Sequence, residues 1–143
     1  MKVMQILKQK GSTAVETVAA TATVADASRL LSKKKIGALV VTKPEGGMLG
    51  ILSERDIVRH IGADGAQALA LPVRDVMTAK VECCAPEDDA NSVLERMTAG
   101  RFRHMPVMVR GQMAGLLSIG DVVKARMDEI QAENEAMAHM LSG

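Results

Sequence analysis

Short apolar runs broken by turn residues dominate the pattern of this chain. Ala38–Val41 and Met48–Ser53 are two such runs, and Pro44–Gly47 between them is rich in turn formers. Continuous apolar runs of this length, bounded by glycine and proline, are typical of strands with a buried face. The arrangement returns as His104–Val109 and Met113–Ser118, with the turn Arg110-Gly-Gln112 between them. The pattern therefore predicts two strand pairs, each closed by a tight turn.

Helical patterns flank each predicted strand pair. In the first half, Val15–Ala19 is predicted as a short extended segment, and Thr23–Asp26 begins a helix that runs to about Lys34. A threonine followed three residues later by an acid indicates a capping box. Lysines at positions 33, 34 and 35 suit the negative end of the helix dipole. A second helix is expected from Glu54.

The second half follows the same order. Pro86–Asp89 opens a helix ahead of the second strand pair. Val73–Thr78 is predicted as a short helical lead-in, which Val3–Leu7 echoes, and the connector Ile61–Leu71 is rich in glycine and alanine. The predicted element order is β-α-β-β-α, twice, which indicates the α+β class.

These two halves are an internal repeat. Residues 46–58 reappear as residues 111–123 at an offset of 65, with seven of thirteen positions identical, where chance would give about one. Upstream the match continues at an offset of 66, so that Ile36 corresponds to Phe102. Units of this size bury little core alone, so we expect them to pack on each other. We assign residues 1–65 to the first repeat, 66–126 to the second and 127–143 to a C-terminal helical tail.

Composition excludes several classes of function. The 143-residue chain is 48% hydrophobic, yet it has no Trp, no Tyr and one Phe, which excludes base-stacking platforms and aromatic membrane belts. A net charge of +1 gives no electrostatic footprint for duplex nucleic acid. No apolar stretch approaches the roughly 20 residues of a membrane helix, and no signal-peptide pattern is present. Cys83 and Cys84 are adjacent rather than spaced as C-x-x-C, which favours a reduced, cytoplasmic protein.

The pattern Gly-x-x-Ser-x-x-Asp ends the second strand of each pair, with Ser53 and Asp56 in one and Ser118 and Asp121 in the other. One interpretation is structural, because a serine and an acid at this spacing cap a helix. The other is a ligand site: the positive end of a helix suits a phosphate, the serine hydroxyl adds a donor, and the carboxylate can accept both hydroxyls of a ribose. Duplication copies caps as well as sites, so the spacing leaves both interpretations open.

Taken together, the motifs resemble a pair of CBS domains, also called a Bateman module, over nearly the whole chain from Val3 to Lys124. The matching pieces are Asp75–Thr78, Ile36–Val41, Phe102–Val107, Gly50–Asp56 and Gly115–Asp121. The resemblance implies an α+β fold of tandem β-α-β-β-α CBS repeats, packed with pseudo-two-fold symmetry into one Bateman module. The stretch Ser118–Lys124, together with Ile6–Gly11 near the start, looks like the stand-alone two-repeat CBS proteins of bacteria and organelles.

The resemblance also implies regulatory binding of an adenosine-containing ligand: AMP, ADP, ATP, NAD(H) or S-adenosylmethionine. Its site motif falls on Ser53 and Asp56 and on Ser118 and Asp121, where the aspartate binds ribose hydroxyls and the serine lies near phosphate. The adenine is expected near the first strand of the other repeat. This places Met77, Thr78 and Val81 by Asp56, and Lys10, Gly11 and Val15 by Asp121.

The two repeats differ in charge beside this motif. The second has Arg103 and His104 ahead of Met105-Pro106, whereas the first supplies Arg55. If a phosphate needs cations, we expect at least one nucleotide site that involves Asp121, with Arg103, His104 and either Arg55 or Lys10 near the phosphates. A solvated surface arginine and a strand-edge histidine remain the alternatives for these residues.

Other constellations are weaker. His60 and His139 have no partners at metal spacing, and no nucleophile–histidine arrangement or phosphate-binding Gly-Lys loop is present, so we expect neither a metal site nor an enzyme. A redox role for Cys83 or Cys84 would require a lowered thiol pKa. Cys83-Cys84 is predicted to lie on the first strand of the second repeat, with one side chain facing the core.

The C-terminal stretch carries a heptad-like seam with steps of four and three residues. Its members are Val123, Met127, Ile130, Asn134, Met137 and Leu141. The seam covers fewer than three heptads, so it predicts either a tail helix packed on its own module or a dimer contact. Because CBS pairs commonly form dimers, the resemblance also implies a homodimer.

The sequence therefore predicts a regulatory module that binds AMP, ADP, ATP or NAD(H) in the cleft between two CBS repeats. Occupancy would change dimer geometry or the activity of a partner protein. The alternative is a structural or protein-interaction CBS module with vestigial ligand sites, in which Ser53 and Ser118 act only as caps. No nucleic-acid or membrane partner is expected.

Overall fold

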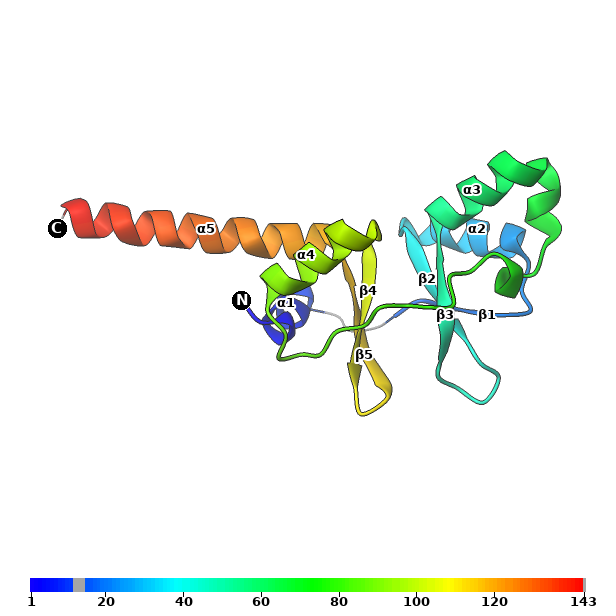
Figure 1. Cartoon of the computed structure of the whole chain (residues 1–143), viewed down its shortest axis with the longest axis horizontal. Coiled ribbons are helices and arrows are strands. Elements are labelled where there is room, and N and C mark those ends of the chain that lie inside the picture. The colour runs from blue at the N-terminus through cyan, green and yellow to red at the C-terminus, as the bar shows by residue number, and fades with distance from the viewer. Residues whose placement is uncertain (12–14, 143) are drawn as a thin grey trace. The chain divides into compact units, whose positions relative to one another are not determined.

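The computed structural model describes residues 1–11 and 15–142. Its residues group into two compact units: residues 15–81, which we call the first unit, and residues 82–142 together with 1–11, which we call the second unit. Each unit carries a strand pair followed directly by a helix (Figure 1). The N-terminal lead-in therefore belongs to the unit that holds the second strand pair.

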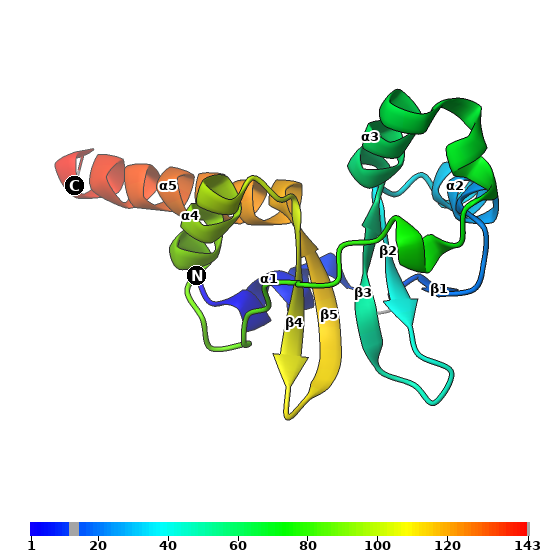
Figure 2. The same cartoon turned by 45° about the vertical axis from the view of Figure 1, so that its right-hand side comes forward.

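The first unit contains a three-stranded sheet and two α-helices. The elements are β1 (Thr17–Ala19), α2 (Val24–Lys34), β2 (Ala38–Thr42), β3 (Met48–Ser53) and α3 (Glu54–Asp64), followed by 3-10 turns at Gly65–Ala70 and Val73–Asp75. The strand order is β1-β2-β3, with β1 parallel to β2 and β2 antiparallel to β3. Figure 2 shows α2 and α3 together at the end of the β2–β3 hairpin opposite its turn. These bounds agree closely with the predicted elements.

Apolar residues of the sheet and helices form the core of the first unit. Leu39, Val41 and Leu52 of the hairpin pack with Val24 and Leu31 of α2, and all five side chains are buried. Thr23 caps α2, because its hydroxyl oxygen accepts the amide N–H of Asp26 at 3.1 Å. The predicted start of this helix is confirmed.

The second unit contains a two-stranded sheet and three α-helices. The elements are α1 (Val3–Lys10), α4 (Ala90–Gly100), β4 (His104–Val109), β5 (Gln112–Ser118) and α5 (Ile119–Ser142), and β4 is antiparallel to β5. Met97, Met105 and Leu117 are fully buried in its core, and the single phenylalanine, Phe102, packs against them as a partly buried residue. Methionine and aliphatic residues thus fill the volume that aromatic rings occupy in other domains.

The predicted first strand of the second repeat is the main error at the level of elements. Cys83-Cys84 does not lie on a strand; Cys84 makes one isolated parallel bridge to Val107. Two backbone hydrogen bonds hold it, from the Cys84 N–H to the Pro106 carbonyl and from the Met108 N–H to the Cys84 carbonyl, both 2.9 Å. The bridge cannot lengthen in either direction, because the next N–H donors of a parallel ladder would be those of Pro86 and Pro106, and proline has no N–H. The Asp88 carboxylate accepts the Ala85 N–H at 2.9 Å where the chain turns toward α4. Cys84 is buried and Cys83 half-buried, as the predicted alternation required.

The two lead-in segments also differ from each other. Val3–Lys10 forms the α-helix α1, whereas only Val73–Asp75 of the predicted lead-in is helical, as a 3-10 turn. Beyond that turn the chain straightens and Thr78 pairs with Ile51 of β3 as an antiparallel bridge. This difference determines which side chain of each lead-in reaches the repeated aspartate.

Candidate functional site

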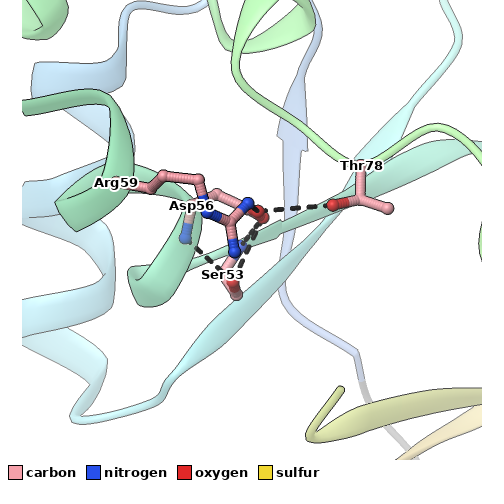
Figure 3. Close-up of polar contacts among 4 residues, drawn as sticks. All are labelled: Ser53, Asp56, Arg59 and Thr78. Atoms are coloured by element: carbon pink, nitrogen blue, oxygen red, sulfur yellow. Dashed lines mark hydrogen bonds and ion pairs between the residues drawn. The ribbon is translucent and has the colours of Figure 1, made fainter. Parts of the chain in front are cut away.

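The turn from β3 into α3 is a closed network around Ser53 and Asp56. The Ser53 hydroxyl accepts the Asp56 N–H at 3.2 Å, while Asp56 Oδ2 accepts the Ser53 N–H at 2.9 Å and the Ser53 hydroxyl at 3.1 Å (Figure 3). This is a complete capping box. The structural interpretation of the repeated motif is therefore correct for this copy, whatever else the residues do.

Thr78 closes the same site from the other side. Its backbone makes both hydrogen bonds of the bridge to Ile51, at 2.8 and 3.0 Å. Gly50 permits this close approach, because a Cβ there would lie 2.5 Å from the Thr78 carbonyl oxygen. The Thr78 hydroxyl then lies 3.3 Å from Asp56 Oδ1, and Arg59 Nη1 lies 3.5 Å from the same oxygen (Figure 3). Asp56 thus uses both carboxylate oxygens within its own unit.

The second copy of the motif has the same cap and a different neighbour. The Ser118 hydroxyl accepts the Asp121 N–H at 3.1 Å, and Asp121 Oδ2 accepts the Ser118 N–H at 2.9 Å. Here α1 supplies the additional donor: Lys10 Nζ lies 2.8 Å from Asp121 Oδ2 and 2.9 Å from the Leu116 carbonyl oxygen. Leu7 of the same helix covers Gly115, where a Cβ would lie 2.8 Å from its Cδ2.

The two aspartates consequently differ in accessibility and in charge. The Asp56 side chain is 8% exposed and the Asp121 side chain is 23% exposed. Burial by itself raises the pKa of Asp121, but the hydrogen bonds from Lys10 and Ser118 outweigh it and hold that pKa below its ordinary value. Asp121 is thus an ionised, partly accessible carboxylate paired with a lysine.

Two of the first three backbone amides of each helix are already engaged. The Glu54 N–H donates to the Gly37 carbonyl at 2.9 Å, and the Ile119 N–H donates to the Arg103 carbonyl at 2.8 Å. The amide of the third helical residue is taken by Ser53 or Ser118. A phosphate here would therefore depend more on side-chain cations than on the helix end.

The remaining predicted site residues lie in three different settings. Arg55 and Arg103 are exposed, and His104 is half-buried opposite Ser118 in the β4–β5 register. Met105 and Pro106 are buried within β4. Val15 and Val81 are half-buried at the two ends of the first unit, and Gly11 is exposed directly after α1.

Two groups that form hydrogen bonds or ion pairs at these turns were absent from the sequence prediction. Arg59 pairs with Asp56 one helical turn away, a spacing that the sequence displays and that predicts such a contact. The Leu116 carbonyl that accepts Lys10 carries no side-chain signal, so no pattern in the sequence indicates it.

The cysteines do not have the environment of a redox site. Burial raises the pKa of Cys84 to about 11 and also raises the pKa of Cys83. A reactive thiol needs the opposite shift, to a lowered pKa.

Among residues 1–11 and 15–142, no group of three or more His, Cys, Asp or Glu is arranged to hold a metal. No helix of that same part of the chain is both long and apolar enough to cross a membrane.

Comparison with protein families matches the CBS domain at residues 6–63 and again at residues 73–128. The chain is a CBS-domain protein. Both matches end beyond the repeated aspartates, so each CBS domain contains one Ser–Asp turn. The tandem repeat and the α+β class are thereby confirmed.

Relatives of this CBS-domain protein include a mitochondrial CBS domain-containing protein from Arabidopsis thaliana. It is 36% identical over 125 residues, which are 85% of this chain and 61% of the relative. The chain therefore spans about three fifths of that protein. A solved CBS-domain protein from Agrobacterium tumefaciens is 42% identical, with a TM-score of 0.85 over 87% of this chain and 92% of that one.

Two more distant structures share the fold and contain ligands. A CBS-domain protein from Pyrobaculum aerophilum was solved with AMP; it is 23% identical, with a TM-score of 0.73 over 85% of this chain and 89% of that one. A CBS domain pair solved with 5′-methylthioadenosine and S-adenosylmethionine is 18% identical, with a TM-score of 0.78 over 90% of this chain and 98% of that one.

Proposed function

We propose that this protein is a regulatory module that binds an adenosine-containing ligand at the turn of Ser118 and Asp121. The observation that carries the proposal is the ionised, partly exposed Asp121 carboxylate with Lys10 beside it. Asp56 is more deeply buried and has hydrogen-bonding partners on both oxygens, so the second repeat offers the more accessible acceptor.

Ribose and phosphate would engage different groups at this turn. A carboxylate suits the paired hydroxyls of a ribose, because each can donate a charge-assisted hydrogen bond to it. A phosphate group competes with Asp121 for the Lys10 ammonium, and drawing that ammonium away leaves the carboxylate open to the ribose. Arg103 is exposed and its carbonyl accepts the Ile119 N–H, so its guanidinium can add positive charge beside this turn, and His104 lies opposite Ser118 in the strand register.

The family supports a ligand class, and the scarcity of aromatic side chains indicates how the adenine would be held. Relatives with this fold hold AMP, 5′-methylthioadenosine or S-adenosylmethionine, which supports an adenosine moiety. With one Phe and no Trp or Tyr, the chain would hold the adenine between aliphatic side chains and backbone. AMP, ADP, ATP and NAD(H) are the ligands we propose.

The wider role is regulatory rather than catalytic. Occupancy would be transmitted to a homodimer or to a partner protein. A reducing compartment such as the cytoplasm is the proposed location, because neither Cys83 nor Cys84 forms a disulfide.

A second candidate function is a structural or interaction module whose ligand sites are vestigial. The complete capping box at Ser53 and the hydrogen-bonded amides at the helix starts favour this function, because both copies of the motif already cap a helix. The two candidates differ in one measurable property, which is saturable nucleotide binding.

Calorimetric titration and a thermal-shift panel with AMP, ATP, NAD and S-adenosylmethionine separate these candidates. We expect one or more of the ligands to raise the melting temperature by mass action and to bind saturably. Asp121→Asn should weaken that binding at least tenfold, because hydrogen bonds to a charged group are worth about 1.5–3 kcal/mol each. Asp128→Asn, on the exposed face of the same helix, is the matched control and should bind normally.

Absence of binding and of any thermal shift across the panel would reject the regulatory proposal in favour of the structural one. Binding that survives Asp121→Asn unchanged would reject the assignment of the site.

A further inference from the structure

Helix α5 has two halves with different surroundings. Its beginning packs on its own unit through Val122 and Ala125, which are buried. Every described residue from 130 to 142 is exposed, and in Figure 1 the orange-to-red part of α5 runs beyond the rest of its unit. A helix of roughly a dozen residues with no packing is marginal in water, so this half needs a partner to be stable.

One apolar stripe runs along both halves of α5. It consists of Val123, Met127, Ile130, Asn134, Met137 and Leu141, spaced alternately by four and three residues. Its apolar members are between 39% and 86% exposed. The stripe lies on a different face from Val122 and Ala125, because those two residues point into the core of the unit. This spacing is that of a coiled-coil seam, and we call the six residues the α5 seam.

The polar member of the seam favours a second copy of this chain in a parallel orientation. In a parallel, in-register pair each seam residue faces its own counterpart, so Asn134 meets Asn134 and the two amides can hydrogen-bond. In an antiparallel pair centred on the seam, Asn134 would face Ile130 and its buried amide would lose that partner. A single asparagine at such a position is a known means of fixing register and pairing.

The charges around the seam support the same arrangement. Residues 127–142 carry Asp128, Glu129, Glu133 and Glu135 and no lysine or arginine. In the parallel pair Glu133 flanks Ala138 of the other copy, whereas in the antiparallel pair it would face Glu133 and be repelled. The exposed acids Asp128, Glu133 and Glu135 also disfavour an anionic membrane surface as the occupant.

We infer that the protein self-associates through a parallel two-stranded coiled coil, in which the α5 seam pairs with the α5 seam of a second copy. The seam is shorter than the three to four heptads of a secure coiled coil, so the dimer is weak and depends on concentration. This inference gives the proposed homodimer a defined surface and orientation, and it does not require any nucleotide.

Sedimentation equilibrium of the full chain without nucleotide tests the surface. We expect a monomer–dimer equilibrium that Ile130→Glu weakens at least tenfold. Ala132→Glu, which places the same charge on the opposite face of α5, is the matched control and should dimerise normally. Met137→Glu, in the fully exposed half, repeats the test where folding of the unit is not involved, and circular dichroism of each variant checks its helix content.

Cross-linking tests the orientation. In a Cys83→Ala and Cys84→Ala background that still self-associates, Asn134→Cys should form a disulfide-linked dimer under mild oxidation, and Ala132→Cys should not. A wild-type chain that stays monomeric at several hundred micromolar overturns the inference, as does a dimer that Ile130→Glu and Met137→Glu leave intact. Bridging of Asn134→Cys only when it is mixed with Ile130→Cys would overturn the parallel orientation. None of these results depends on nucleotide binding, so they test the dimer independently of the proposed function.

Discussion

Each serine of the repeated motif holds the first turn of a helix, irrespective of any ligand. Ser53 accepts the Asp56 N–H and Ser118 accepts the Asp121 N–H. Removal of such a cap typically costs about 1 kcal/mol, so Ser53→Ala and Ser118→Ala should each lower the free energy of unfolding by about that amount. Urea denaturation measures it, and Ser92→Ala, on the exposed face of α4, is the control that should change little. Unchanged stability in both cap variants would show that these hydroxyls do not contribute measurably to folding.

The ion pair of Lys10 and Asp121 makes a second, pH-dependent contribution. The pKa of Asp121 is lower in the folded chain than its ordinary value, so the folded state binds the proton less readily than the unfolded state. The resulting stabilisation is complete above the unfolded pKa of about 4 and is lost as the pH falls through that value toward the folded pKa. Lys10→Met removes the cation and should flatten the fall in unfolding free energy between about pH 5 and pH 3. Equal slopes in the two proteins would show that Lys10 does not hold Asp121 in solution.

Among the elements, the sequence pattern predicted those whose signals are local. The apolar runs and their glycine turns marked β2, β3, β4 and β5 almost to the residue, because a strand pair with a buried face needs that alternation of runs and turns. It failed at Cys83-Cys84, whose neighbours were expected to form a strand. There a longer parallel ladder would need N–H donors from Pro86 and Pro106, which have none, and the apolar pattern takes no account of this.

At the candidate site, too, the sequence pattern predicted the contacts that depend on local spacing and missed those that depend on tertiary structure. The serine–aspartate caps follow from spacing along the chain, and the structure shows them in both repeats. The family resemblance placed Thr78 by Asp56 and Lys10 by Asp121, and both side chains contact those aspartates. The residue pattern alone does not predict these two neighbours, because α1 continues as a helix to Lys10 whereas the chain straightens before Thr78. Tertiary pairing of Thr78 with Ile51 decides that difference. The repeats are thus equal in sequence pattern and unequal in the donor that each aspartate receives.

At the scale of the whole molecule, one continuous helix joins the candidate site to the candidate dimer surface. Asp121 is the third residue of α5 and Val123, the first member of the α5 seam, follows two residues later. A ligand that draws Lys10 away from Asp121 changes the contacts of the first turn of α5, and a helix transmits such a shift along its length. The site and the seam are therefore expected to be thermodynamically coupled.

Linkage makes this coupling testable from both sides. If a nucleotide changes the dimer dissociation constant by some factor, dimerisation must change the affinity for that nucleotide by the same factor, and couplings of this kind are typically about 5- to 150-fold. We expect the dimer constant, measured by sedimentation with and without saturating AMP, to shift within this range. The AMP affinity of Ile130→Glu, which is held monomeric, should differ from that of the wild-type dimer by a matching factor. A dimer constant that AMP leaves unchanged, together with equal AMP affinities in the two proteins, would mean that α5 connects the two sites without coupling them. Occupancy would then have to be signalled through a partner that contacts the Asp121 turn directly.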